Sequence, residues 1–251
     1  MTIPETNLNG KWALITGAAK RLGECTARAL HQHGANIAIH YRGSEKPAQE
    51  LADSLNGIRP DSAFTVQADL LNSEALLSLI KTVTEKTGQL DILINNASSF
   101  YPTPLGTVTE DQWLDLIGSN LKAPLFLSQA ALPFLRKSQG CIINIVDIHS
   151  QRPLREHTVY GPAKAALAML TKTLAKDLAP DVRVNGVSPG AILWPDEGMS
   201  SKAAESIIKQ VPMKRTGDPT DIARTVLFLI KDAPYITGQI IAVDGGRSIG
   251  W

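Results

Sequence analysis

Short apolar stretches alternate with longer amphipathic stretches along nearly the whole chain. The apolar stretches are rich in valine, isoleucine and leucine, which indicates strands that are buried on both faces. We expect strands at 11–16, 36–41, 62–68, 90–95, 141–146, 182–187 and 239–243. Between them, helical repeats of apolar positions predict helices at 22–33, 47–55, 71–87, 109–135 (interrupted at Pro124), 162–179, 200–210 and 218–229.

This alternation predicts an α/β fold, with one domain built on a Rossmann-type doubly wound parallel sheet of about seven strands and helices on both faces. No internal repeat, linker or low-complexity segment divides the sequence. Ligands bind to such sheets outside the carboxyl ends of the strands. The residues expected at these ends, and therefore expected to meet in one cleft, are Thr16, Tyr41, Asp69, Asn95 and Asp147.

The bulk composition narrows the class of protein. The chain has 251 residues and a formal net charge of +1, which argues against a surface that binds nucleic acid or anionic membranes. Two cysteines, Cys25 and Cys141, are too few for a disulfide framework. The sequence has no signal pattern and no apolar run long enough to span a membrane, which predicts a cytoplasmic protein. The histidines have no metal-binding spacing, so no metal is expected, and His149 and His157 are interpreted as solvated or peripheral.

The segment 16–23, Thr-Gly-Ala-Ala-Lys-Arg-Leu-Gly, connects the first strand to the first helix. Glycines let a backbone approach a pyrophosphate closely, and the start of a helix supplies free N–H groups and positive potential. An ordinary strand–helix connection has the same appearance, so this turn indicates a dinucleotide site only together with other signals.

Tyr160 and Lys164 lie four residues apart in a predicted helix, so their side chains share one helix face. An ammonium group beside a phenol lowers the pKa of the tyrosine, which makes the tyrosine a usable proton donor near neutral pH. Asp147 ends the apolar stretch 141–146. We therefore expect these three side chains to form a proton-transfer site.

The turn 16–23, the Asn95-Asn96-Ala97 segment and the Tyr160/Lys164 pair together resemble the short-chain dehydrogenase/reductase family in order and spacing. The resemblance covers nearly the whole chain and supports a single domain, 1–251. It implies a dinucleotide-binding core over 10–188, a substrate loop over 189–215, and a C-terminal helix and last strand over 216–251.

Three departures from the usual family pattern resemble the pteridine reductase branch. Arg21 stands where the family usually has glycine, Ser98 follows Asn-Asn-Ala in place of glycine, and Asp147 replaces a serine. The resemblance implies that Arg21 reaches both the cofactor phosphate and a pterin. Phe100 then offers a face on which a flat heteroaromatic ring can stack.

The end of the second strand and the residues that follow it, 40–44, read His-Tyr-Arg-Gly-Ser. This segment lacks the acidic residue that would bind the ribose hydroxyls of NAD. Arg42, Ser44 and Lys20 are placed to bond a 2′-phosphate, which predicts NADPH as the cofactor. The expected cofactor-binding residues are Gly17, Lys20, Arg21, Leu22, Tyr41, Arg42, Ser44, Asp69, Leu70, Asn96, Ala97, Ser98, Tyr160, Lys164, Pro189 and Gly190.

The resemblance further implies reduction of a pterin or folate, such as dihydrobiopterin, dihydromonapterin or dihydrofolate, by hydride transfer to a ring C=N bond. The expected substrate-binding residues are Arg21, Ser98, Phe100, Asp147, Tyr160 and Trp194. Tyr160 would donate the proton and Asp147 would relay one, since an ionised carboxylate only accepts hydrogen bonds. By resemblance, Lys164 holds the nicotinamide ribose and Asn120 anchors a water near it.

Two alternative functions stay open. The first is an NADPH-dependent ketone or 3-oxoacyl reductase, against which Asp147 argues. The second is a non-catalytic NADPH-binding regulator, against which the intact Tyr160, Lys164 and Asn120 argue. The family implies a homotetramer, with the helices expected at 109–135 and 162–179 as the contact face.

Overall fold

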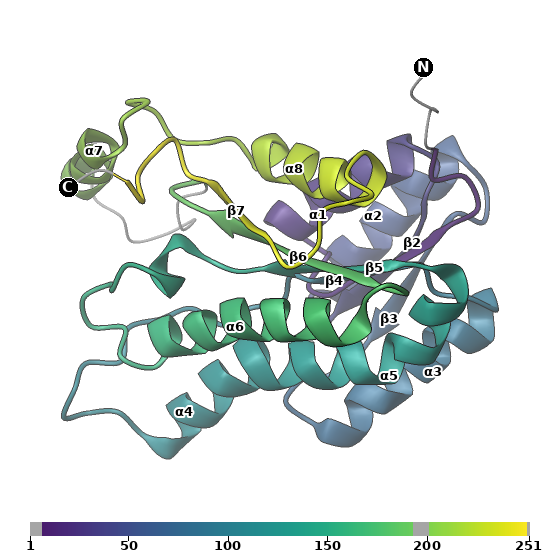
Figure 1. Ribbon diagram of the computed structural model, residues 1–251, viewed down its shortest axis with the longest axis horizontal. Helices are drawn as coiled ribbons and strands as arrows, with labels where there is room; N and C mark the ends of the chain where they lie inside the picture. The colour runs from purple at the N-terminus through teal and green to yellow at the C-terminus, as the bar shows by residue number, and fades with distance from the viewer. Residues whose placement is uncertain (1–6, 193–200, 250–251) are drawn as a thin grey trace.

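The computed structural model describes residues 7–192 and 201–249. Within these residues seven parallel strands form one sheet in the order β3-β2-β1-β4-β5-β6-β7 (Figure 1). The strands are β1 (Trp12–Ile15), β2 (Asn36–Tyr41), β3 (Ala63–Gln67), β4 (Ile92–Asn95), β5 (Cys141–Ile145), β6 (Arg183–Pro189) and β7 (Ile240–Val243). The predicted doubly wound sheet of about seven strands is confirmed.

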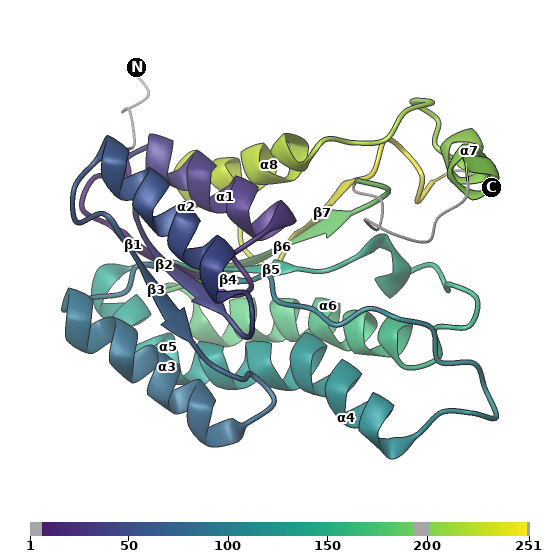
Figure 2. The same cartoon turned by 180° about the vertical axis from the view of Figure 1, so that it is seen from behind.

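Helices cover both faces of the sheet (Figures 1 and 2). One face carries α1 (Arg21–Gln32), α2 (Glu45–Ile58) and α8 (Pro219–Lys231). The other carries α3 (Ser73–Thr87), α4 (Glu110–Ile117), α5 (Ala123–Ser138) and α6 (Tyr160–Leu178). The short α7 (Ser201–Gln210) lies beyond the carboxyl end of β7. No helix in the described part of the chain is long and apolar enough to cross a membrane.

Strand β1 shows why the strands are apolar along their whole length. Ala13 and Ile15 pack into the core beneath α1 and α8, whereas Leu14 packs into the core on the opposite face. All three side chains are fully buried. Because successive side chains of a strand point to opposite faces, a strand covered on both sides must be apolar at every position.

The predicted helix 109–135 is divided into three segments. The side chain of Thr109 accepts a hydrogen bond from the backbone of Gln112 and starts α4, and a π-helical segment (Gly118–Lys122) separates α4 from α5. The break was predicted at Pro124, but it lies just before this residue, in the π-helical segment. Pro124 lies in the first turn of α5, directly after the π-helical segment. π-Helical segments often mark functional sites.

Candidate active site

A cavity of about 640 Å³ opens at the carboxyl ends of the strands, beside the point where the strand order reverses between β1 and β4. Most of the residues singled out by the sequence line it. They are Gly17, Lys20, Arg21, Leu22, Tyr41, Arg42, Ser44, Asp69, Leu70, Asn96, Ala97, Ser98, Phe100, Asp147, Tyr160, Lys164, Pro189 and Gly190. Trp194 lies outside the described residues.

Thr16 and Asn95 do not line this cavity, so the prediction that they open into the cleft is wrong. The Thr16 hydroxyl accepts the backbone N–H groups of Asn96 and Ala97 at 2.9 and 3.0 Å. The Asn95 amide donates to Oδ1 of Asn144 at 2.8 Å. Both side chains are buried and form hydrogen bonds with polar groups at the ends of the strands. These hydrogen bonds hold the backbone where it enters the site.

The glycine turn is held by a histidine that the sequence pattern did not single out. The N–H of Gly17 donates to Nδ1 of His40 at 3.0 Å, and Nε2 of His40 lies 3.1 Å from the carbonyl oxygen of Ala68. Because Nδ1 accepts, the proton is on Nε2 and the ring is neutral. Burial lowers the pKa of His40 to about 4. The available signal was a histidine inside an otherwise apolar strand.

Two positions of the turn have special backbone requirements. A Cβ atom on Gly23 would lie 2.4 Å from the carbonyl oxygen of Gly17, so only glycine permits this close approach. Arg21 has φ 57°, in the left-handed region, although it carries a side chain. This conformation costs a non-glycine residue about 1 kcal/mol. The usual family glycine at position 21 would bear no such strain.

Two of the three proton-transfer residues, Tyr160 and Asp147, share a hydrogen bond, whereas Lys164 bonds to the backbone beside them. The hydroxyl of Tyr160 donates to Oδ2 of Asp147 at 2.8 Å, and Oδ1 of Asp147 accepts the N–H of His149 at 2.8 Å. The ammonium group of Lys164 is buried and donates to the carbonyl oxygen of Ile145 at 2.8 Å. Both oxygens of Asp147 accept hydrogen bonds, as an ionised carboxylate does.

The pKa of Tyr160 is raised by burial and by the charge and hydrogen bond of Asp147. The predicted lowering of this pKa is wrong, because burial, the largest cause, and Asp147 together outweigh the opposing hydrogen bond of Ser98, and the phenol stays protonated. Burial lowers the pKa of Lys164 to about 8, against an opposing effect of Asp147. Burial also lowers the pKa of Arg247, a C-terminal residue that the sequence pattern missed, while Asp147 opposes this shift.

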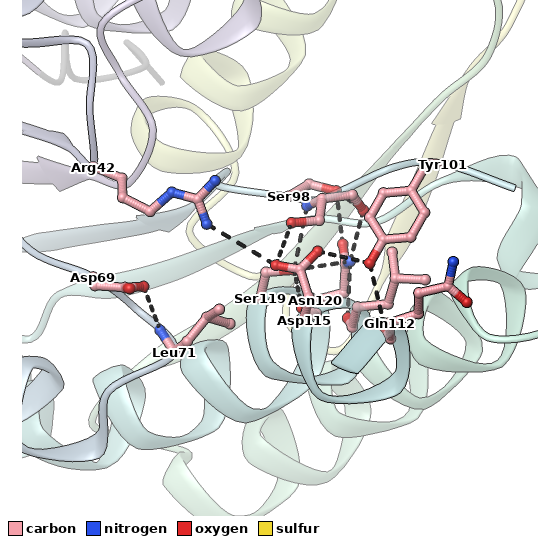
Figure 3. A network of polar contacts seen from close by, with 11 residues as sticks. Arg42, Asp69, Leu71, Ser98, Tyr101, Gln112, Asp115, Ser119 and Asn120 are labelled. Atoms are coloured by element: carbon pink, nitrogen blue, oxygen red, sulfur yellow. Dashed lines mark hydrogen bonds and ion pairs between the residues drawn. The ribbon is translucent and has the colours of Figure 1, made fainter. Parts of the chain in front are cut away.

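Asn120 lies in the π-helical segment and is 1% exposed. Its amide donates to the carbonyl oxygens of Ser99 and Leu116 at 2.9 and 3.0 Å and accepts the Ser98 hydroxyl at 2.7 Å. It does not line the cavity. In this arrangement Asn120 anchors the loop after β4 (Figure 3).

Phe100 presents an aromatic surface beside Tyr160. Its ring is 54% exposed and meets the Tyr160 ring edge-on, with centroids 4.8 Å apart. The His157 ring stacks on Phe100 at a centroid distance of 4.8 Å. His157 is half-buried, so its interpretation as a solvated or peripheral residue is wrong. Phe100 and His157 are far apart in the sequence, and nothing in the sequence indicated that their rings are in contact.

Comparison with known proteins is consistent with this geometry. A family model described as enoyl-(acyl carrier protein) reductase matches residues 17–248. Pteridine reductase 1 of Leishmania tarentolae is 40% identical over 278 residues, covering 94% of this chain and 96% of that protein. The 3-oxoacyl-(acyl-carrier-protein) reductase FabG of Staphylococcus aureus is 37% identical over 240 residues, covering 94% of this chain and 97% of that protein.

A solved structure, a blue fluorescent protein from a metagenomic library in complex with NADPH, superposes with a TM-score of 0.91. It is 32% identical and covers 96% of this chain and 99% of that one. The chain therefore belongs to the short-chain dehydrogenase/reductase family of oxidoreductases.

Proposed function

We propose that the protein is an NADPH-dependent reductase that converts a dihydropterin or dihydrofolate to the tetrahydro form. The observation that carries this proposal is the 2.8 Å hydrogen bond between Tyr160 and a carboxylate, Asp147, beside the exposed ring of Phe100. The similarity to a Leishmania pteridine reductase supports it.

The nucleotide half of the cavity fits NADPH. Gly23 allows the start of α1 to pack closely on the backbone of the glycine turn, and Lys20, Arg42 and Ser44 line the same cavity. Arginine and lysine bind phosphate groups strongly, and no acidic residue stands in 40–44 to select NAD. The related structure solved with NADPH supports this cofactor.

When bound, NADPH supplies the hydride, and the residues of the chain manage the proton. Tyr160 is held protonated and donates to the ring nitrogen of the substrate. Asp147 is hydrogen-bonded to the same hydroxyl and lines the cavity, so it relays a replacement proton from water to the phenolate. The buried ammonium of Lys164 stabilises the negative charge that Tyr160 carries between these transfers.

Phe100 orients the substrate in this proposal. Its exposed face offers offset stacking to a flat heteroaromatic ring. Because its edge packs on Tyr160, a ring stacked there lies next to the proton donor. Arg21 lines the same cavity and supplies a cation for the phosphate or the pterin.

A 3-oxoacyl or ketone reductase is the second candidate, favoured by 37% identity to a 3-oxoacyl-(acyl-carrier-protein) reductase. In such enzymes a serine hydroxyl usually polarises the carbonyl oxygen beside the tyrosine. Asp147 accepts two hydrogen bonds and donates none, so this site lacks the hydroxyl that a serine would provide.

The test is NADPH oxidation with dihydrobiopterin and dihydrofolate, with an acetoacetyl thioester as the control. Turnover of the pterin substrates alone supports the proposal. Turnover of the thioester alone replaces it with the carbonyl reductase. If NADPH binds but no substrate oxidises it, a non-catalytic regulator becomes the better account.

We also propose that the protein assembles as a homotetramer. Helices α4, α5 and α6 lie on the same side of the sheet and carry exposed large apolar side chains: Trp113, Leu114, Leu125, Phe126 and Met169. Exposed apolar side chains gathered on one face mark a contact surface. Light scattering on the purified protein should give four times the chain mass, and a monomer would refute the assembly.

A further inference from the structure

The carboxylate of Asp115, near the end of α4, joins the two halves of the site (Figure 3). Its Oδ1 accepts the Ser99 hydroxyl at 3.1 Å and its Oδ2 accepts the Tyr101 hydroxyl at 3.0 Å. The same Oδ1 lies 4.0 Å from a guanidinium nitrogen of Arg42, at the far side of the nucleotide half of the cavity. Oδ1 of Asp115 therefore interacts with both the Ser99 hydroxyl and the Arg42 guanidinium group.

On the loop side, Asp115 holds the residues before and after Phe100. The backbone N–H of Ser99 also donates to the Ser119 hydroxyl, so the loop is tied both to α4 and to the π-helical segment that follows it. Burial raises the pKa of Tyr101, and the hydrogen bond to Asp115 adds to this, so Tyr101 remains a donor. Asp115 therefore helps to hold the loop that carries the Phe100 ring beside Tyr160.

On the nucleotide side, the contact is easily exchanged. The Arg42 side chain is 63% exposed and its distance to Asp115 is at the limit of an ion pair. Exposed ion pairs of this kind contribute little free energy. A phosphate dianion offers arginine a stronger, bidentate partner. Arg42 will therefore leave Asp115 when a 2′-phosphate binds beside it.

We propose that Asp115 is a positioning residue through which the 2′-phosphate of the cofactor tightens the loop that carries Phe100. When Arg42 moves to the phosphate, both oxygens of Asp115 are left to Ser99 and Tyr101. When the bound dinucleotide has no 2′-phosphate, Arg42 stays paired with Asp115. The loop that carries Phe100 is then held less firmly. The inference rests on the proposed assignment of NADPH, and it gives the phosphate a role in substrate binding as well as in cofactor selection.

The experiment compares adenosine 2′,5′-bisphosphate with 5′-AMP, which differ only in the 2′-phosphate. Their dissociation constants are measured by calorimetry, and amide hydrogen exchange of the peptide covering 98–103 is followed at saturation with each. We expect the bisphosphate to bind more tightly and to slow exchange of this peptide about fivefold or more relative to 5′-AMP, the low end of typical coupling between sites.

Four variants separate the contributions. Arg42→Ala and Asp115→Asn should abolish the exchange difference, because each removes one end of the ion pair. Tyr101→Phe should shrink it while keeping the preference for the bisphosphate. Asp111→Asn is the matched control: it makes the same chemical change one helical turn earlier, at an exposed position, and should keep the difference.

The outcomes are distinguishable. Tighter binding of the bisphosphate with equal exchange for both nucleotides overturns the coupling and leaves the NADPH assignment standing. Equal dissociation constants overturn both. An exchange difference that survives in Asp115→Asn also overturns the role of this residue. Neither measurement needs a turnover substrate, so failure of the pterin assay does not affect the test.

Discussion

The hydroxyl of Tyr160 donates a 2.8 Å hydrogen bond to Oδ2 of Asp147. This contact gives the site a proton donor and a proton acceptor that share one hydrogen bond. A serine at position 147 would interact with a carbonyl oxygen, whereas the aspartate is suited to passing on a proton. In the proposed reduction of a pterin, the proton chemistry is concentrated at this pair.

Substitution of Asp147 should therefore affect turnover and leave cofactor binding unchanged. Asp147→Asn keeps the size of the side chain and an acceptor for Tyr160, but the amide cannot carry the proton. We expect kcat for pterin reduction to fall about 100-fold or more, the usual contribution of a general acid or base. Asp147→Ser should have a similar effect. The dissociation constant of NADPH, measured by fluorescence, is the control, and undiminished turnover in both variants would remove Asp147 from the mechanism.

Arg21 offers a test of strain against function. Its φ of 57° suits glycine, so Arg21→Gly relieves the backbone while removing the guanidinium. Arg21→Ala removes the same group and keeps the strain. We expect urea denaturation to show the glycine variant about 1 kcal/mol more stable than the alanine variant. Both should bind NADPH more weakly than the unaltered protein. Equal stabilities would mean that position 21 bears no strain.

His40 should make folding stability depend on pH. Its pKa is about 4 in the folded protein and 6.5 when unperturbed, so the unfolded chain binds the proton first as pH falls. Stability is therefore lost between about pH 6.5 and 4, by roughly 3 kcal/mol from this residue. His40→Asn keeps an acceptor for the N–H of Gly17 and does not titrate. The stability advantage of the unaltered protein over this variant should shrink toward pH 4; a constant difference would contradict the assignment.

Lys164 should set the alkaline limit of cofactor binding. Burial lowers its pKa to about 8, so the ammonium charge is present below this pH and lost above it. We expect the dissociation constant of NADPH to rise above about pH 8, and kcat/KM to fall. In Lys164→Met this dependence should be absent. Lys172→Met, at an exposed position of the same helix, should retain it. If Lys164→Met and Lys172→Met gave the same pH profile, the loss of binding at alkaline pH would belong to another group.

The strands and their order along the chain could be predicted because a buried parallel strand must be apolar on both faces. The cavity could be predicted because parallel strands bring their carboxyl ends to one edge of the sheet. Lys20, Arg42 and Asp69 accordingly lie at one cavity, as their positions after strands indicate. Thr16 and Asn95 follow the same rule in sequence, yet their side chains serve buried backbone and amide groups.

Other parts of the site had no sequence signal. Asp115 lies on a helix among other polar residues. The sequence does not distinguish a carboxylate that faces the solvent from one that accepts hydrogen bonds from two hydroxyl groups, as Asp115 does. The stack of His157 on Phe100 joins two loops whose paths no periodicity describes. The raised pKa of Tyr160 depends on the balance of burial and a nearby charge, which needs coordinates.

Thr103 determines how the substrate end of this site can change. It is fully buried, and its backbone and hydroxyl bond to Glu156, Thr158 and Val159 in the facing loop. The two loops are therefore one cooperative unit that carries Phe100 on one side and His157 on the other. An exchange of substrate specificity with a relative must transplant both loops together, because either one alone would lose its partner for Thr103.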